Sequence, residues 1–184
     1  MTRLHIRKNL LASFFCAAAT VLGIAENMLP QIGAVPGGKI GAANAVCALV
    51  LYIYGAKYAF SVSIIRAFLV SFILGGANVL PYSLSGAVLS MTVMALFYRN
   101  KNLSPVGICI LGAFFNNAAQ IFTSCIMLKN TAPLYTFTYL APVSLICGAA
   151  VGILVKKLLK YKSAILKEDK INKEDKININ DNFD

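Results

Sequence analysis

Residues Ala56–Leu74 read AKYAFSVSIIRAFLVSFIL, an apolar run with a charged residue, Arg66, near its middle. A helix needs about 20 predominantly apolar residues to cross the roughly 30 Å of hydrocarbon in a bilayer. The run is long enough for this. It therefore predicts a membrane-spanning helix that carries a guanidinium at bilayer depth.

Five further apolar runs flank this one, and short polar or Pro/Gly-rich segments separate them. They lie at Leu10–Met28, Gly41–Tyr54, Tyr82–Phe97, Pro105–Met127 and Leu134–Leu159. The whole chain is 58% hydrophobic, well above the roughly 45–50% apolar content of soluble domains, and its mean hydropathy is +0.71. We predict an all-α polytopic membrane protein whose residues 1–161 form six transmembrane helices.

Basic residues mark one side of the predicted bundle. They are Arg3, Arg7, Lys8, Lys57, Arg99, Lys101, Lys156, Lys157 and Lys160. The loops on the other side hold only Lys39 and Lys129. Because cytoplasmic loops carry the excess of Lys and Arg, both termini are predicted to be cytoplasmic, in a multi-pass protein of the cell membrane.

The net charge of +10 favours anionic lipid headgroups over nucleic acid as partners. The basic residues are spread along predicted inner helix ends, whereas nucleic-acid sites cluster them with stacking aromatics. The five cysteines occur singly within apolar runs, and His5 is the only histidine. We expect packing cysteines and no metal or cofactor site.

Residues 162–184 differ in composition from the rest of the chain. The letters KEDKIN occupy Lys167–Asn172 and recur at Lys173–Asn178. Such a segment offers too little apolar area to offset the entropy of an ordered chain. We expect a charged cytoplasmic tail that is disordered or, at most, a frayed continuation of the last helix.

Glu26 is the only acidic residue before this tail, and Arg66 is the base at greatest predicted depth. An ionised group facing lipid costs from about 3 to more than 10 kcal/mol, so Arg66 needs a partner. Two interpretations are open. One is an internal bridge to Glu26 or to helix carbonyls and amides, and the other is the acidic group of a ligand, which suits a guanidinium.

The segment Gly33–Ile40 reads GAVPGGKI and has Walker A spacing through Lys39. Ile40 stands where the magnesium-binding Ser or Thr belongs, and no strand leads into the segment, so we do not expect nucleotide hydrolysis. Two interpretations stay open for Lys39. It forms an anion site with the glycines and the start of the next helix, or it extends to the membrane interface beside a simple turn.

Span five carries amides that are costly to bury. Spacings of i+4, i+7 and i+11 place four residues on one helix face: Ala113, Asn117, Gln120 and Ser124. Buried amides need several hydrogen-bond partners, which makes Asn117 and Gln120 candidates for ligand binding. In span one, small residues four apart, such as Ser13 and Ala17, predict close helix approach, either inside the bundle or with a partner helix.

Four blocks carry a resemblance to a known family. They are PGGKIGAAN at Pro36–Asn44, Arg66, YSLSGAVLS at Tyr82–Ser90, and Gly112–Gln120. Over about residues 8–160 the chain resembles the Gx transporter family, also labelled heptaprenyl diphosphate synthase component I. That family is similar to the six-helix, substrate-binding S components of energy-coupling-factor transporters. Its fifth-span block ends in His-Asn-x-x-Gln, whereas this chain has Asn116 before Asn117, so a proton-carrying histidine is not expected.

The resemblance implies an S-component-like bundle that binds a small anionic or amphiphilic molecule such as a vitamin, isoprenoid or quinone precursor. Transport would then require a transmembrane coupling subunit and ATPases in trans. The family label implies an alternative, a non-catalytic membrane accessory subunit of heptaprenyl diphosphate or quinone biosynthesis. Prenyl diphosphate synthases hold magnesium through aspartate clusters, which Glu26 alone cannot form, so we do not expect an enzyme. A purely structural scaffold is a third possibility.

The substrate site that we predict opens on the outer side of the bundle. Its residues are Lys39, Asn44, Arg66, Tyr82, Ser83, Asn117 and Gln120, with Glu26 as a charge partner. The two cations neutralise an acidic group, the amides supply hydrogen bonds, and the tyrosine and serine line the mouth. No residue is predicted to be catalytic or to bind metal.

Overall fold

The computed structural model describes the backbone of residues 3–28, 42–74, 78–100 and 102–180, and the side chains of 9–26, 28, 43–74, 78–100 and 102–161. The described backbone forms six helices and no strand. They are α1 (Arg3–Met28), α2 (Ala42–Tyr54), α3 (Ala56–Leu74), α4 (Leu80–Phe97), α5 (Pro105–Leu128) and α6 (Pro133–Asn180). The prediction of an all-α fold is confirmed.

Local chemistry explains where several helices begin. Proline occupies the first turn of α4 and of α5, where its missing N–H leaves no intrahelical bond unmade. The Ser104 hydroxyl caps α5 by accepting from the Gly107 N–H at 3.3 Å. Between α2 and α3, Gly55 has a φ of +89°, a conformation that side chains disfavour, so a single residue separates the two helices.

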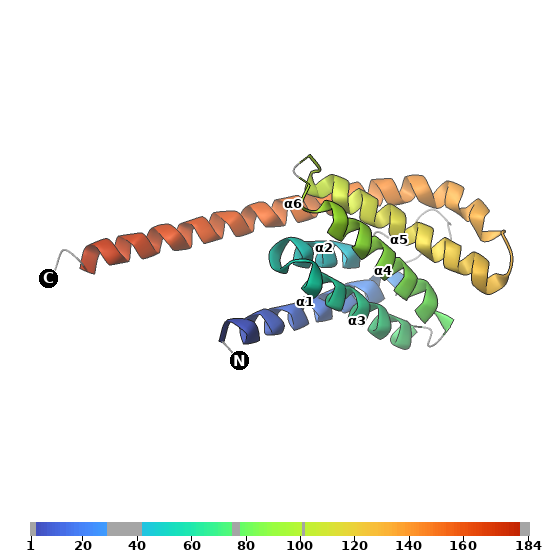
Figure 1. Ribbon diagram of the computed structural model, residues 1–184, viewed down its shortest axis with the longest axis horizontal. Coiled ribbons are helices and arrows are strands. Elements are labelled where there is room, and N and C mark those ends of the chain that lie inside the picture. Colours follow the sequence, from blue (N-terminus) through green and yellow to red (C-terminus); the bar gives the residue numbers. More distant parts are fainter. Residues whose placement is uncertain (1–2, 29–41, 75–77, 101, 181–184) are drawn as a thin grey trace.

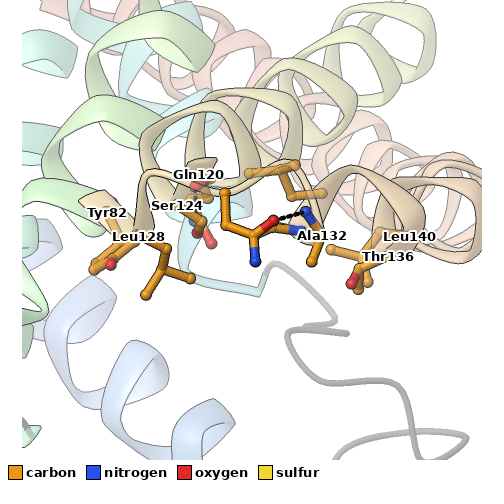
Figure 2. A pocket seen from close by; sticks show the side chains of 10 residues that line it. Tyr82, Gln120, Ser124, Leu128, Ala132, Thr136 and Leu140 are labelled. Atoms are coloured by element: carbon orange, nitrogen blue, oxygen red, sulfur yellow. Dashed lines mark hydrogen bonds between the residues drawn. The ribbon is translucent and has the colours of Figure 1, made fainter. Parts of the chain in front are cut away.

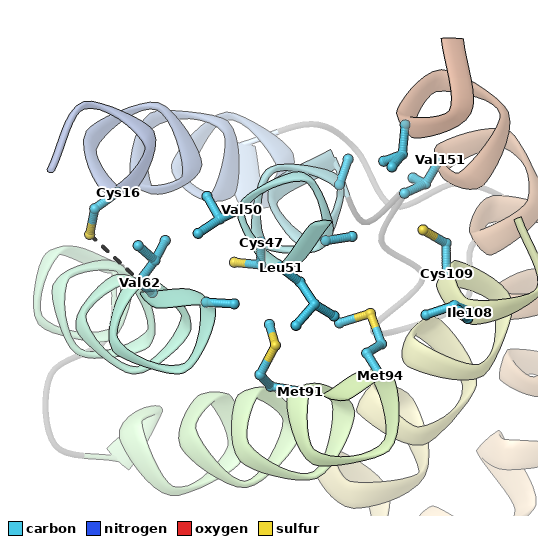
Figure 3. Packing of buried hydrophobic residues seen from close by; sticks show 14 residues of the cluster. Cys16, Cys47, Val50, Leu51, Val62, Met91, Met94, Ile108, Cys109 and Val151 are labelled. Carbon is cyan, nitrogen blue, oxygen red and sulfur yellow. Dashed lines mark hydrogen bonds between the residues drawn. The ribbon is translucent and has the colours of Figure 1, made fainter. Parts of the chain in front are cut away.

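Helix α2 is the central element of the bundle. It contacts all five other helices, which surround it in the spatial order α1, α3, α4, α5, α6 (Figure 1). Its buried residues include Cys47, Val50 and Leu51. They pack against Met91 and Met94 of α4 in the core (Figure 3).

Five helices are long and apolar enough to cross a membrane: α1, α3, α4, α5 and, over Pro133–Tyr161, α6. Helix α2 has 13 residues, which rise only about 20 Å at 1.5 Å per residue. The chain is therefore a multi-pass membrane protein by its helices, and the count of six spans stays a prediction. Large apolar side chains cover the outside, with Phe72 73% and Ile146 71% exposed, as lipid contact requires.

Helix α6 continues far beyond its apolar part. It runs through both KEDKIN copies to Asn180 and leaves the bundle as a single helix (Figure 1). Of the two forms that the sequence allowed for this segment, the backbone has the helical one, which agrees with the high helix propensity of its Lys and Glu residues. The division into a membrane domain and a tail at residue 161 stays a prediction.

The pair α5 and α6 is held at very short range toward the N-terminal end of the bundle. A Cβ on Gly152 would lie 2.5 Å from the Cα of Val106, and one on Gly148 would lie 2.8 Å from the Cα of Ile110. Only glycine permits this approach. The five cysteines are free thiols, three of them buried, in keeping with their predicted packing role.

Candidate functional site

A pocket of about 510 Å³ lies where α4 begins, α5 ends and α6 begins (Figure 2). It is at the end of the bundle away from the N-terminus (Figure 1), and we call it the α4–α6 pocket. Ten described residues line it: Tyr82, Gln120, Ile121, Ser124, Leu128, Asn130, Ala132, Pro133, Thr136 and Leu140. Polar and apolar side chains are equally represented among them.

Some polar groups of the pocket are already engaged, and others are free. Ser124 donates its hydroxyl proton to the Gln120 carbonyl at 2.9 Å, and Asn130 Oδ1 accepts from the Ala132 N–H at 3.0 Å. Within the described part of the chain, the Tyr82 hydroxyl, the Gln120 side-chain amide and the Thr136 hydroxyl make no hydrogen bond. These three groups are available to a ligand.

Helix α4 positions Gln120 through a glycine. A Cβ at Gly86 would lie 3.0 Å from Gln120 Nε2 and 2.7 Å from Asn116 Oδ1, so both amides occupy the space that a side chain would fill. One turn further on, Thr123 donates to Ser85 Oγ at 2.8 Å, and Ser85 donates to the Tyr82 carbonyl at 3.1 Å. The contact between α4 and α5 thus fixes the floor of the pocket.

Arg66 lies in the middle of α3 and is half-buried. Its Nη2 donates to Asn44 Oδ1 of α2 at 3.1 Å, while its buried Nε has no hydrogen-bond partner in the described structure. The internal interpretation of Arg66 is therefore met in part, because the Asn44 amide binds one nitrogen of the guanidinium. Arg66 is not among the residues that line the α4–α6 pocket.

Asn44 also borders a small internal cavity of about 10 Å³, close to the space that one water needs. Ala113 lines this cavity, whereas Gln120 lines the α4–α6 pocket. Asn117, which is 7% exposed, lies between them along the same face of α5. This face of α5 therefore extends from the small cavity beside Asn44 to the α4–α6 pocket.

The family model for heptaprenyl diphosphate synthase component I matches residues 15–158. The chain belongs to this family. No curated protein and no solved structure matches it. The name describes a component of a synthase, and the described residues of this component I chain contain no group of three or more His, Cys, Asp or Glu side chains that could hold a metal ion.

The structure distributes the predicted site residues of this component I chain over two places. Tyr82 and Gln120 share the α4–α6 pocket, and Asn44 and Arg66 form a pair elsewhere. Ser83 is half-buried on α4 but does not line the pocket.

The two remaining predicted charges have different outcomes. Lys39 lies outside the described residues. Glu26 is half-buried near the end of α1. Its role as the partner of Arg66 or Lys39 stays a prediction.

Sequence reasoning missed the part of the pocket wall that follows α5. Asn130, Ala132, Thr136 and Leu140 belong to the connection between α5 and α6 or to the start of α6. The available signal was the polar run from Lys129 to Thr131 followed by a helix that begins with hydroxyl residues. It indicated a loop but could not show that the loop closes a cavity.

A second concavity, the α1–α3 groove, has a volume of about 460 Å³. It is lined by Asn9, Ala12, Ser13, Cys16 and Ala17 of α1 and by Tyr58, Ser61, Val62, Ile65 and Leu69 of α3. The small residues of α1 were predicted to pack inside the bundle or to contact a partner helix, and they divide between two faces of α1. Ala19 is fully buried and Gly23 packs near Val70 inside the bundle, whereas Ser13 and Ala17 are exposed on the groove.

Proposed function

We propose that this chain is a substrate-binding membrane component that holds a small amphiphilic or anionic molecule in the α4–α6 pocket, in the manner of an energy-coupling-factor S component. The observation that carries the proposal is the pocket itself. Its volume of about 510 Å³ falls within the roughly 300–1,000 Å³ typical of small-molecule sites. Three unengaged polar groups over apolar walls are what an amphiphile needs.

Transport by such a component depends on other subunits. Import against a gradient would require a transmembrane coupling subunit and ATPases in trans. The α1–α3 groove is the surface that we assign to the coupling subunit, because exposed small residues such as Ser13 and Ala17 allow a partner helix to approach closely.

A non-catalytic accessory subunit of heptaprenyl diphosphate or quinone biosynthesis is the second candidate, and the family match favours it. In this case a soluble synthase docks on the basic end of the bundle. Exposed cations at that end are Lys57, Arg99, Lys156, Lys157 and Lys160. The pocket would then hold an isoprenoid for the partner. A purely structural scaffold is less consistent with three polar groups in the α4–α6 pocket that make no hydrogen bond within the described part of the chain.

Purification of the full chain from native membranes, with identification of the proteins that accompany it, separates the two candidates. The transporter proposal expects ATPases and a transmembrane subunit, and it expects Ala17→Leu to weaken their recovery because the larger side chain fills the groove. Phe122→Ala, on a lipid-facing position that is 67% exposed, is the matched control. Recovery of a prenyl synthase would support the second candidate, and recovery of neither partner would contradict both.

A further inference from the structure

The α4–α6 pocket carries no charge among the described residues that line it. Lys129 lies between Leu128 and Asn130 in the chain, yet it is exposed and does not line the pocket. Arg66 is bonded to Asn44 on α2. Neither of these two cations therefore lies in the wall of the pocket: Lys129 is exposed, and Arg66 is hydrogen-bonded to a residue of α2.

Helix ends replace only part of the missing charge. The N-terminal ends of α4 and α6 and the C-terminal end of α5 meet at the pocket. Each N-terminal end carries about +0.5 of an elementary charge and the C-terminal end about −0.5, so the end of α5 offsets one of the two positive ends. An anion bound here would lose hydration without gaining a full counter-charge, which is unfavourable. An uncharged group needs only hydrogen bonds.

The hydrogen-bonding groups suit such an uncharged head. The Gln120 amide both donates and accepts, and the Tyr82 and Thr136 hydroxyls also do both. All three make no other hydrogen bond within the described part of the chain. Apolar walls from Ile121, Leu128 and Leu140 are left for a hydrocarbon body.

We infer that the α4–α6 pocket takes an uncharged amphiphile, with a hydroxyl or carbonyl head read by Gln120 and Tyr82 and an isoprenoid-like apolar body. This inference rests on the proposed function and decides between the two ligand classes that it leaves open. Gly86 is a positioning residue in this account, because the empty space at its Cα holds the Gln120 amide in place.

Farnesol and farnesyl phosphate test the inference directly, since the two molecules share one apolar body and differ in the charge of the head. Binding of each radiolabelled probe is measured on the purified full chain in lipid nanodiscs. We expect farnesol to bind at least about tenfold more tightly than the phosphate, a difference near 1.4 kcal/mol. Gln120→Leu removes this preference, and Phe122→Ala, the lipid-facing control, retains it.

Three outcomes would overturn the inference, and they bear differently on the proposed function. Tighter binding of farnesyl phosphate that depends on Gln120 rejects the uncharged head but keeps the pocket as the binding site. A preference for the phosphate that disappears in Lys39→Met or Lys129→Met assigns the head to a cation instead. Absence of saturable binding for both probes rejects the ligand class and leaves the pocket to be tested by the molecules that accompany the purified protein.

Discussion

Helices α5 and α6 behave differently in their two halves. Toward the N-terminal end of the bundle, Gly148 and Gly152 bring the two backbones into contact. Toward the other end, Gln120 and Thr136 face each other across a cavity of about 510 Å³. We call these parts the closed half and the open half of the α5–α6 pair. The cavity lies in the half where neither Gly148 nor Gly152 brings the two backbones together.

The change from closed to open occurs near a proline. Pro142 lies inside α6, between Leu140, which lines the pocket, and Gly148, which packs against α5. Proline lacks the N–H that would bond to the carbonyl of Thr138, and it favours bending of a helix. Along α6 the chain therefore passes from the hydroxyl residue Thr136 through Pro142 to Gly148, in the same order as the open half, the transition and the closed half.

The largest effect is expected from Gly152→Leu, which breaks the closed half. The new side chain would meet the backbone of Val106, which cannot move aside as a side chain can. Overpacking of this kind costs about 3 kcal/mol or more, so thermal unfolding in detergent should occur at a clearly lower temperature. Gly107→Ala is the control, because its Cβ would lie 3.3 Å from the flexible Leu103 side chain and 3.9 Å from Ser104 Oγ, with no backbone atom among these neighbours. Equal unfolding temperatures of the two variants would contradict the close approach of α5 and α6 at Gly152.

Gly86→Ala tests whether the open half depends on the position of Gln120. The added methyl would displace Gln120 Nε2 and Asn116 Oδ1, both at the ends of flexible side chains. We expect farnesol affinity to fall by about tenfold, or 1.4 kcal/mol, with little change in unfolding temperature. Ala118→Gly, a change on a half-buried α5 position outside the pocket lining, should leave affinity as in the wild type. Unchanged farnesol affinity in Gly86→Ala would show that this glycine does not position Gln120.

Arg66 lies on α3, outside the α5–α6 pair, so its replacement should change stability without changing ligand binding. Arg66→Ala leaves Asn44 Oδ1 without its donor, and an unsatisfied buried group costs about 1–3 kcal/mol. We expect lower thermal stability and a coupling energy with Asn44→Ala of about 1 kcal/mol in a double-mutant cycle. Farnesol affinity should stay unchanged. A loss of affinity without a loss of stability would move Arg66 into the binding site.

Pro142→Ala is expected to have the smallest effect. It restores a backbone donor at the transition between the halves and favours a straighter α6. A straighter helix would narrow the pocket, so farnesol affinity should fall by about two- to threefold while the unfolding temperature changes little. Binding that is unaffected by Pro142→Ala would show that the proline does not set the width of the open half.

The sequence predicted the helices well because each apolar run is bounded by prolines, glycines or charges. The predicted run Ala56–Leu74 coincides with α3, and Pro105–Met127 differs from α5 by one residue at its end. The exception is α2, which is helical where predicted but too short to settle the span count. Its central position could not be predicted, because the run carries no signal for contacts with all five neighbours.

The candidate site could be predicted only in part. Tyr82 and Gln120 were recognisable as polar groups in apolar runs, and the structure brings them together. An amide partner for Arg66 was one of the open interpretations, but Asn44 was not singled out, because spacing within a helix gives faces and depths but not which faces meet. The same reason explains why Thr136 and Leu140 were missed, since their place in the pocket depends on how α6 packs against α5.

Native mass spectrometry of the full chain, released directly from its own membranes, tests the pocket most directly. Wild-type protein and Phe122→Ala should each carry a bound small molecule of uncharged, amphiphilic character, and Gln120→Leu purified in parallel should have lost it. A bound molecule that survives equally in Gln120→Leu, with all three proteins folded, would contradict the assignment of the α4–α6 pocket as the binding site.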